Sequence, residues 1–316
     1  QKMHNNLFIW YFSGTGNARF AAKKIAETAA RKGQNSFVFN MAGQKEDFPK
    51  ITQNDILVFC YPTHGFNAPP LVLNYLARFP KGKSKVYLLN TRAGMKLYKI
   101  HTAGVGGIAL WLPALILFLK GYKPFGFRPL DLPSNWISLH PGIRRKVVHS
   151  IYNRCSKTLE LFTNRILHRK SMLNGLFWLP VDIPLIPVSA GYYFFGRFAL
   201  AKTFFASYKC NNCGLCIKQC PSQAIIKKNN RPFWTFRCES CMKCLNNCPE
   251  RAIETAHGFT FLLWWLVFSL VPYLIVNFLV ENQFISVEFY RQYASWIYYI
   301  IMFSAGFAIL FIGYHI

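Results

Sequence analysis

The sequence CNNCGLCIKQCP at residues 210–221 recurs as CESCMKCLNNCP at residues 238–249, 28 positions further along the chain. Both runs have the spacing Cys-x-x-Cys-x-x-Cys-x-x-x-Cys-Pro, and the residues that follow also match, PSQAI against PERAI. Three thiolates on so tight a loop can wrap one face of a metal–sulfur cube, and the proline then turns the chain away. The repeat therefore predicts a pair of similar cluster-binding loops.

This spacing is the one found in bacterial ferredoxins, where the fourth cysteine of each run ligates the other cluster. We expect one [4Fe–4S] cluster on Cys210, Cys213, Cys216 and Cys248, and a second on Cys220, Cys238, Cys241 and Cys244. Structural zinc is the first alternative, but zinc sites typically use two CxxC pairs without the final Cys-Pro. A disulfide framework is the second, and it is typical of short secreted chains. The pattern favours two clusters in a reducing compartment.

Composition and charge limit the classes of partner. Of the 316 residues, 52% are hydrophobic and 17% aromatic, which suggests membrane contact. The first 258 residues hold 36 of the 37 basic and 10 of the 12 acidic residues. The resulting positive electrostatic potential attracts anionic lipid headgroups, acidic proteins or nucleic acid. A nucleic-acid role would rest on charge alone, so we expect none. Cys60 and Cys155 lie outside both runs and are expected to be small buried apolar residues.

The start of the chain has the pattern of a phosphate site. LFIWYF at residues 7–12 reads as a short buried strand and runs straight into a glycine loop, so no signal peptide is expected. The loop SGTGN at residues 13–17 is followed by a predicted helix over residues 18–32. Backbone N–H groups, hydroxyls and the helix dipole would all favour an anion there. Further strands are predicted over residues 36–40, 55–60 and 85–89.

The run FSGTGN resembles the phosphate loop of flavodoxin-like proteins, which bind FMN. The resemblance implies a doubly wound parallel α/β sheet, in which the loops after the third and fourth strands flank the flavin ring. Position 18 departs from the pattern, since flavodoxins commonly have Thr or Ser where this chain has Ala18. The residues implied for FMN are Ser13, Gly14, Thr15, Gly16, Asn17, Pro62, Thr63, His64, Gly65, Thr91, Arg92, Ala93 and Gly94.

Taken with the cysteines, residues 7–257 resemble a family of prokaryotic fusion proteins, with a flavodoxin-like domain first and a two-cluster ferredoxin second. KGY at residues 120–122 and LPSNW at residues 132–136 add to the resemblance. The domains expected are a flavodoxin-like domain (1–135), a basic and apolar interfacial linker (136–208), a small α+β ferredoxin domain (209–257) and a transmembrane hairpin (258–316).

Several stretches point toward a membrane. Residues 104–119 are uncharged, residues 141–172 read as a basic helix, and prolines interrupt the apolar stretch at 173–206. Residues 259–280 and 294–314 are uncharged runs of 22 and 21 residues, and each would cross a bilayer as a helix. The positive-inside rule then predicts the redox domains on the cytosolic side of a prokaryotic cytoplasmic membrane.

The pairing of FMN with two clusters predicts an oxidoreductase component that carries electrons to a membrane or lipophilic acceptor. The expected partners are the lipid bilayer and redox donor and acceptor proteins or a quinone-like substrate. One alternative is a reductase acting directly on a quinone or unsaturated lipid, with Tyr61 and His64 as candidate proton donors. Another is a non-catalytic redox sensor or assembly subunit.

Overall fold

The computed structural model describes residues 6–43, 48–136, 143–256, 258–259, 262, 265–286, 288–289, 291–293, 296, 299–300 and 304. The chain divides into two compact units. One unit holds residues 1–201 and 206–253, and the other holds residues 202–205 and 254–316. The sheet, both cysteine runs and the helical segments up to Ala201 belong to the first unit.

The first unit is built on a parallel sheet with the strand order β2-β1-β3-β4-β6. Its strands are β1 (Leu7–Tyr11), β2 (Ser36–Asn40), β3 (Ile56–Pro62), β4 (Lys85–Leu97) and β6 (Lys123–Pro133). β1 and β3 are almost wholly buried, as expected of parallel strands covered on both faces. The order reverses between β1 and β3, which is the flavodoxin-like doubly wound arrangement. The predicted α/β fold class is confirmed for this part of the chain.

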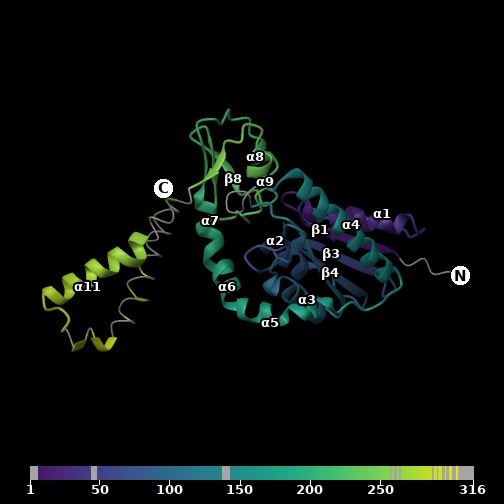
Figure 1. Ribbon diagram of the computed structural model, residues 1–316, viewed down its shortest axis with the longest axis horizontal. Helices are drawn as coiled ribbons and strands as arrows, with labels where there is room; N and C mark the ends of the chain where they lie inside the picture. Colours follow the sequence, from purple (N-terminus) through teal and green to yellow (C-terminus); the bar gives the residue numbers. More distant parts are fainter. Residues whose placement is uncertain are drawn as a thin grey trace. The chain divides into compact units, whose positions relative to one another are not determined.

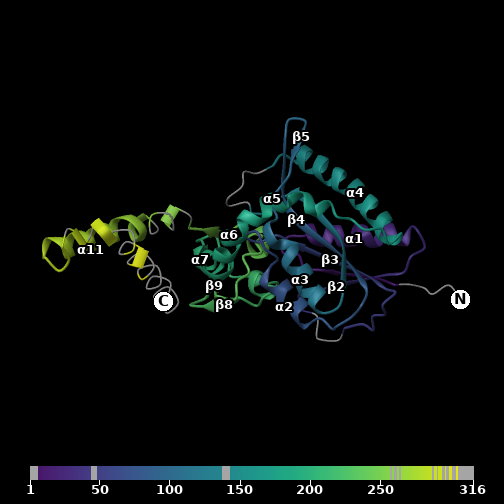
Figure 2. The ribbon, with the colours of Figure 1, turned by 90° about the horizontal axis from the view of Figure 1, so that it is seen from below.

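Helices cover both faces of the sheet (Figures 1 and 2). α1 (Asn17–Ala30) and α4 (Arg145–Leu167) pack against one face, and α2 (Pro70–Arg78) and α3 (Trp111–Leu119) pack against the other. α4 lies in the stretch predicted as a basic linker helix. Its buried residues Ile151, Cys155, Leu159, Phe162 and Ile166 form one stripe along the helix, which packs in the same core as α1.

The uncharged stretch at residues 104–119 forms a short 3-10 turn, η1 (Gly107–Ala109), and then α3. α3 buries Pro113, Ala114 and Leu117 and leaves Phe118 and Leu119 exposed. The strand before this stretch forms a hairpin: β4 continues past the predicted end at Leu89 and pairs antiparallel with β5 (Ile100–Thr102).

Between α4 and the first cysteine run, the chain forms a series of short helical segments. They are η2 (Asn174–Trp178), α5 (Leu179–Asp182), η3 (Ile183–Leu185), α6 (Ile186–Gly191), η4 (Tyr192–Gly196) and α7 (Arg197–Thr203). Pro180, Pro184 and Pro187 each stand in the first turn of a segment, where a missing N–H removes no hydrogen bond. The absence of a single long helix over residues 173–206 is as predicted.

The cysteine runs are carried by short elements. These are β7 (Phe204–Ala206), α8 (Leu215–Lys218), β8 (Ile225–Lys228), β9 (Arg231–Trp234), α9 (Lys243–Asn246) and β10 (Ile253–Thr255). β7 pairs with β10, and β8 pairs antiparallel with β9. The two runs fold alike, because the same positions in each repeat take a left-handed backbone: Asn212 and Gly214 in the first, Ser240 and Met242 in the second.

The predicted transmembrane hairpin, and with it the membrane localisation, is contradicted by the structure. Within the described residues no helix has both the length and the apolar character that crossing a bilayer requires. The second unit has a π-helical segment, η5 (Leu266–Leu270), followed by α11 (Val271–Glu281). α11 has 11 residues and therefore rises only about 16 Å, against the ~30 Å of a hydrocarbon core. Parts of the predicted run 259–280, and most of 294–314, lie outside the described residues.

Candidate flavin and iron–sulfur sites

A cavity of about 410 Å³ lies at the carboxyl-terminal edge of the parallel sheet, where ligands of doubly wound sheets bind. Eight of the thirteen residues predicted for FMN line it: Asn17, Pro62, Thr63, His64, Gly65, Thr91, Arg92 and Ala93. Ser13, Gly14, Thr15, Gly16 and Gly94 are not among the lining residues. The rest of the wall comes from Phe66, Gly104, Val105, Pro133, Ser134, Asn135, Trp136, Tyr192, Leu200, Ser240 and Met242.

The loop after β3 turns sharply at His64, whose backbone forms a bridge with Asn67. Gly65 has φ +53°, and a Cβ there would collide with the ring of Tyr192, which covers the turn. The His64 ring is hydrogen-bonded to the backbone of Glu239, and burial lowers the pKa of His64 to about 4. Its Nδ1 has no hydrogen-bond partner in the described part of the chain. His64 is therefore neutral at physiological pH, and its Nδ1 is buried without a hydrogen bond.

The predicted phosphate loop leads into α1 through Gly16, which is left-handed with φ +112°. Gly16 N–H donates to the Ser13 hydroxyl over 2.9 Å, and the Thr15 hydroxyl accepts a hydrogen bond from Asn135. The Asn17 side chain is also bound within the protein, donating to the Pro133 carbonyl over 2.9 Å. The first turn of α1 has no acidic residue, so no carboxylate there repels an anion. The loop thus ends at the N-terminus of α1, and the side chains of Ser13, Thr15 and Asn17 are held by hydrogen bonds within the protein.

Arg92 is held rigidly at the wall of the cavity. Its guanidinium donates to both carboxylate oxygens of Asp131, over 2.9 and 3.1 Å, and lies over the Trp178 ring with 4.3 Å to the centroid. Asp131 also accepts from the Gly104 N–H over 2.9 Å. The side chain of Arg92 is only 2% exposed, so this bidentate pair is a buried one. The pair links β4 to β6, and Asp131 links both strands to Gly104 in the wall of the cavity.

The loop of the second cysteine run packs directly on the phosphate loop. A Cβ built on Gly14 would lie 2.9 Å from the Cβ of Cys241, and closer still to its carbonyl oxygen. The Leu71 N–H donates to the Glu239 carboxylate over 3.2 Å, and Asn246 donates to the Asn135 carbonyl over 3.0 Å. Burial raises the pKa of Glu239 to about 7, although the hydrogen bond from Leu71 opposes the shift. These contacts join the two cofactor-binding regions within one compact unit.

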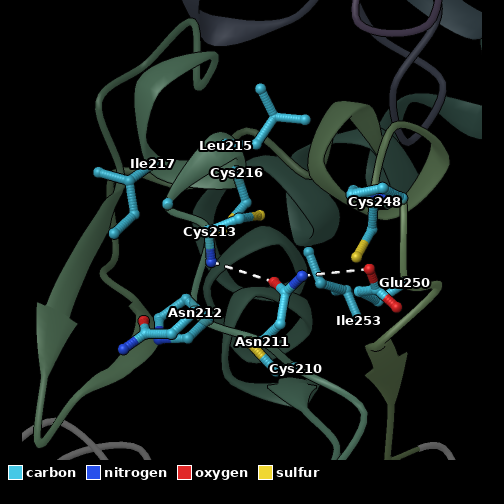
Figure 3. Close-up of a pocket in the computed structure, with 13 residues that line it drawn as sticks. Cys210, Asn211, Asn212, Cys213, Leu215, Cys216, Ile217, Cys248, Glu250 and Ile253 are labelled. Atoms are coloured by element: carbon cyan, nitrogen blue, oxygen red, sulfur yellow. Dashed lines mark hydrogen bonds between the residues drawn. The ribbon is translucent and has the colours of Figure 1, made fainter.

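The first predicted set of cysteines comes together around one hollow. Cys210, Cys213, Cys216 and Cys248 all line it, so the last cysteine of the second run joins three cysteines of the first. Figure 3 shows the sulfur atoms of Cys210 and Cys248 on either side of the Asn211 side chain. That side chain accepts from the Cys213 N–H over 3.2 Å and donates to Glu250 over 3.1 Å.

The second predicted set is more deeply buried. Burial raises the pKa of Cys238 to about 12 and that of Cys244 to about 11, and it raises the pKa of Cys241 further. Cys220, from the first run, is close enough to the other three to add to these shifts. Buried thiols of this kind become thiolates only beside strong positive charge, which iron supplies. The structure thus places Cys220 near the cysteines of the second run, and the crossed ligation stays a prediction.

Backbone N–H groups point at the sulfur atoms in both sets. Ala224 N–H donates to Cys220 Sγ over 3.3 Å, Ala252 N–H to Cys248 Sγ over 3.3 Å, and Ser240 N–H to Cys238 Sγ over 3.4 Å. Hydrogen bonds to ligating sulfurs tune the reduction potential of a cluster. Among the described residues, no three His, Cys, Asp or Glu side chains are close enough for a single metal ion. All ten cysteines are without disulfides, and Cys60 and Cys155 are buried as predicted.

The cavity has the features expected of a flavin site. Its volume is within the usual range for a small-molecule pocket. Residues of its wall include His64 and Trp136, whose Nδ1 and Nε1 atoms are buried without a hydrogen-bond partner among the described residues. The wall also carries the hydroxyl side chains of Thr63, Thr91 and Ser134, and a few polar groups placed in a mostly apolar wall can orient a bound ring. The donor sets of four thiols, in turn, suit iron–sulfur clusters.

Comparisons with known proteins agree with this geometry. A family model described as Flavodoxin matches residues 9–95, and one described as 4Fe-4S dicluster domain matches residues 209–253. The chain joins a flavodoxin domain to a 4Fe-4S dicluster domain. The first domain implies FMN and the second implies iron–sulfur clusters, so the cofactor prediction is confirmed. The prokaryotic origin that the resemblance implied stays a prediction.

Solved structures with some likeness to the chain include several flavodoxins. The flavodoxin of Streptococcus pneumonia TIGR4 is 15% identical, with a TM-score of 0.35, covering 52% of this chain and 99% of that one. Oxidised flavodoxin 2 from Bacillus cereus is 15% identical, with a TM-score of 0.32, covering 51% and 99%. Rubredoxin oxygen:oxidoreductase from Desulfovibrio gigas is 13% identical, with a TM-score of 0.31, covering 52% and 37%. A search of curated proteins found no match.

Sequence reasoning missed the part of the cavity wall that comes from outside the flavodoxin loops. Ser240 and Met242 stand between the cysteines of the second run, at positions treated only as spacers. Trp136 lies in the LPSNW stretch, which was used as a mark of resemblance and not as a site. Tyr192 carried no signal in the sequence, because its place over Gly65 depends on the path of the segmented helices.

Proposed function

We propose that this electron-transfer oxidoreductase is an internal relay, in which electrons pass between FMN and the two [4Fe–4S] clusters of the same chain. The observation that carries the proposal is the shared wall. Ser240 and Met242, from the loop of the second cysteine run, line the cavity that suits the flavin. Cys241, between them in sequence, touches Gly14 of the phosphate loop. A flavin exchanges electrons in pairs or singly, whereas a cluster passes one at a time.

The residues of the chain hold the two ends of the relay in contact. His64 bridges them directly, because it lines the cavity and its ring is bonded to the backbone of Glu239. That glutamate stands between Cys238 and Cys241, two of the proposed ligands. Tyr192 and Trp136 add aromatic side chains to the wall of the cavity. With Arg92 fixed by Asp131, the wall is rigid, which favours electron exchange over rearrangement.

The two cysteine sets differ in burial, and this difference suggests their order in the relay. The set of Cys220, Cys238, Cys241 and Cys244 is next to the flavin cavity; Cys244 is buried and the other three are partly buried. The other set reaches the surface, where Cys213 is exposed. We infer a sequence of FMN, inner cluster and outer cluster, with exchange to other molecules at the outer one. Redox donor and acceptor proteins are the proposed partners, and the two alternative functions remain predictions.

The relay is tested with the anaerobically purified holoprotein. The flavin is reduced by a light flash, and the clusters are followed by absorbance and by EPR. Internal transfer should be first order, with a rate that does not change when the protein is diluted tenfold. A rate proportional to protein concentration would show that electrons travel between molecules, and the relay would then be wrong.

A pair of variants separates the flavin from the clusters. Gly65→Val should empty the cavity of flavin, because it adds backbone strain and a collision with Tyr192, while iron stays at about eight atoms per chain. Gly33→Val is the matched control, because Gly33 is also left-handed, at φ +73°, but has open space around it. Flavin retained at the wild-type level in Gly65→Val would contradict the placement of the flavin in this cavity.

A further inference from the structure

The surface around the outer cysteine set is strongly basic. Residues 209–253 contain eight Lys and Arg and only two Glu. Four of these basic side chains, Lys209, Lys218, Arg231 and Arg251, are exposed, and each is next in sequence to a residue that lines the hollow. Of the two acidic residues, Glu239 is largely buried against the flavodoxin domain. Positive charge therefore gathers beside the hollow that Cys213 lines, and we call these four cations the basic ring.

The cations of this ring are available to a partner. None of the ion pairs recorded among the described residues involves any of the four. Arg231 is held in place by its own backbone contact, donating to the Ser207 carbonyl over 2.7 Å. The one acidic residue at the hollow, Glu250, receives a hydrogen bond from Asn211. The field of the ring is thus largely uncompensated within its own domain.

Exposed apolar side chains lie near the same hollow. Leu215 lines the hollow and is 40% exposed, and Tyr208, two residues before Cys210, is 85% exposed. A small apolar centre inside a charged rim is the composition of a transient protein interface, where the rim steers the encounter and the centre gives contact. Weak redox complexes are small interfaces of this kind.

We propose that the basic ring around the outer cysteine set is the docking surface for a small acidic one-electron carrier protein. This inference rests on the proposed relay and names the partner at its outer end. Each encounter moves one electron between the carrier and the outer cluster, so that one is oxidised as the other is reduced and no bond forms. The outer set reaches the surface through the exposed Cys213, which is why the carrier meets the protein there.

Binding is the first readout, because it does not depend on turnover. The holoprotein is titrated by calorimetry with a small acidic ferredoxin, and in parallel with basic cytochrome c, at rising ionic strength. The acidic carrier should bind at low salt and weaken steeply as the Debye length falls to about 8 Å at physiological salt. The basic carrier should show no binding. Affinity for the acidic carrier that does not change with salt would overturn the proposal.

Matched charge reversals locate the surface. Lys209→Glu with Lys218→Glu should lower both the affinity and the association rate constant for the acidic carrier by about tenfold or more. Lys81→Glu with Lys83→Glu makes the same change in net charge, but these exposed residues precede β4 at the opposite edge of the sheet. The control pair should bind as the wild type does at moderate salt. An equal loss in both pairs would mean general attraction and no docking surface.

The same variants distinguish this proposal from the relay itself. Flash reduction of the flavin followed by transfer to the clusters should be unchanged in Lys209→Glu with Lys218→Glu, since neither residue lines the flavin cavity. Normal internal transfer with unaltered carrier binding overturns the docking surface and leaves the relay intact. Carrier binding as expected, but without internal transfer, overturns the relay.

Discussion

Gly14 is the point at which the phosphate loop touches the loop of the inner cluster, so a single methyl group there tests their contact. In Gly14→Ala the new Cβ would start 2.9 Å from the Cβ of Cys241. Carbon atoms prefer 3.5–4.0 Å, so the two loops must separate by roughly 1 Å. Gly14 has no left-handed φ, so the added methyl acts through packing and not through backbone strain.

Overpacking of this size costs about 1–3 kcal/mol. At about 2–4 °C per kcal/mol for a unit of 150–250 residues, the melting temperature should fall by several degrees. The internal transfer from flavin to clusters should slow as well, since the same shift widens the gap between them. Differential scanning calorimetry under anaerobic conditions gives the first quantity, and flash photolysis gives the second.

Gly191→Ala is the matched control for this prediction. Gly191 ends α6, has open space around it and lies at a helical φ of −56°. Replacing it with Ala should leave stability unchanged or raise it by ~0.5–1 kcal/mol. If Gly14→Ala matches the wild type in melting temperature and in transfer rate, then the two loops do not pack as described and the reasoning fails.

Three further outcomes are expected. Asp131→Ala should cost about 3–5 kcal/mol in urea unfolding, because it leaves the Arg92 guanidinium buried without its partner; a loss under about 1 kcal/mol would mean a solvent-screened pair. Cys248→Ser should alter the EPR signal of the outer cluster, and Cys220→Ser that of the inner one; the reverse assignment would refute crossed ligation. Burial lowers the pKa of His64 to about 4, so between pH 6.5 and 4 the unfolded chain gains a proton that the folded chain does not. His64 alone would lower stability by up to about 1.4 kcal/mol per pH unit as the pH falls, whereas the raised pKa of Glu239 acts in the opposite direction. In chemical denaturation, the stability of His64→Gln should therefore fall less with falling pH, or rise more, than that of the wild type.

The sequence determined the parts of this protein whose chemistry is local. A cysteine spacing that repeats after 28 residues carries its own ligand pattern, because the loop geometry follows from the spacing. The apolar strand before SGTGN and the helix after it could likewise be predicted, because the spacing of apolar residues and the positions of glycines indicate local backbone structure. From these runs alone came the fold class of the first domain and both kinds of cofactor.

Hydropathy alone was a poor guide to the C-terminal part. Residues 259–280 and 294–314 are as apolar as membrane spans, but an apolar run specifies only that its side chains avoid water. It does not specify how long the helix will be. The longest described helix of that part is the 11-residue α11, and the predicted localisation was therefore wrong.

Long-range packing sets how the two cofactor regions meet. Nothing local in the sequence brings Cys241 to Gly14, or Tyr192 over Gly65, because these pairs are more than a hundred residues apart. Their contact depends on the proline-segmented helices that return the chain to the carboxyl edge of the sheet. The sequence thus determined which cofactors the chain can hold, whereas long-range packing decided that Ser240 and Met242 would form a wall of the flavin cavity.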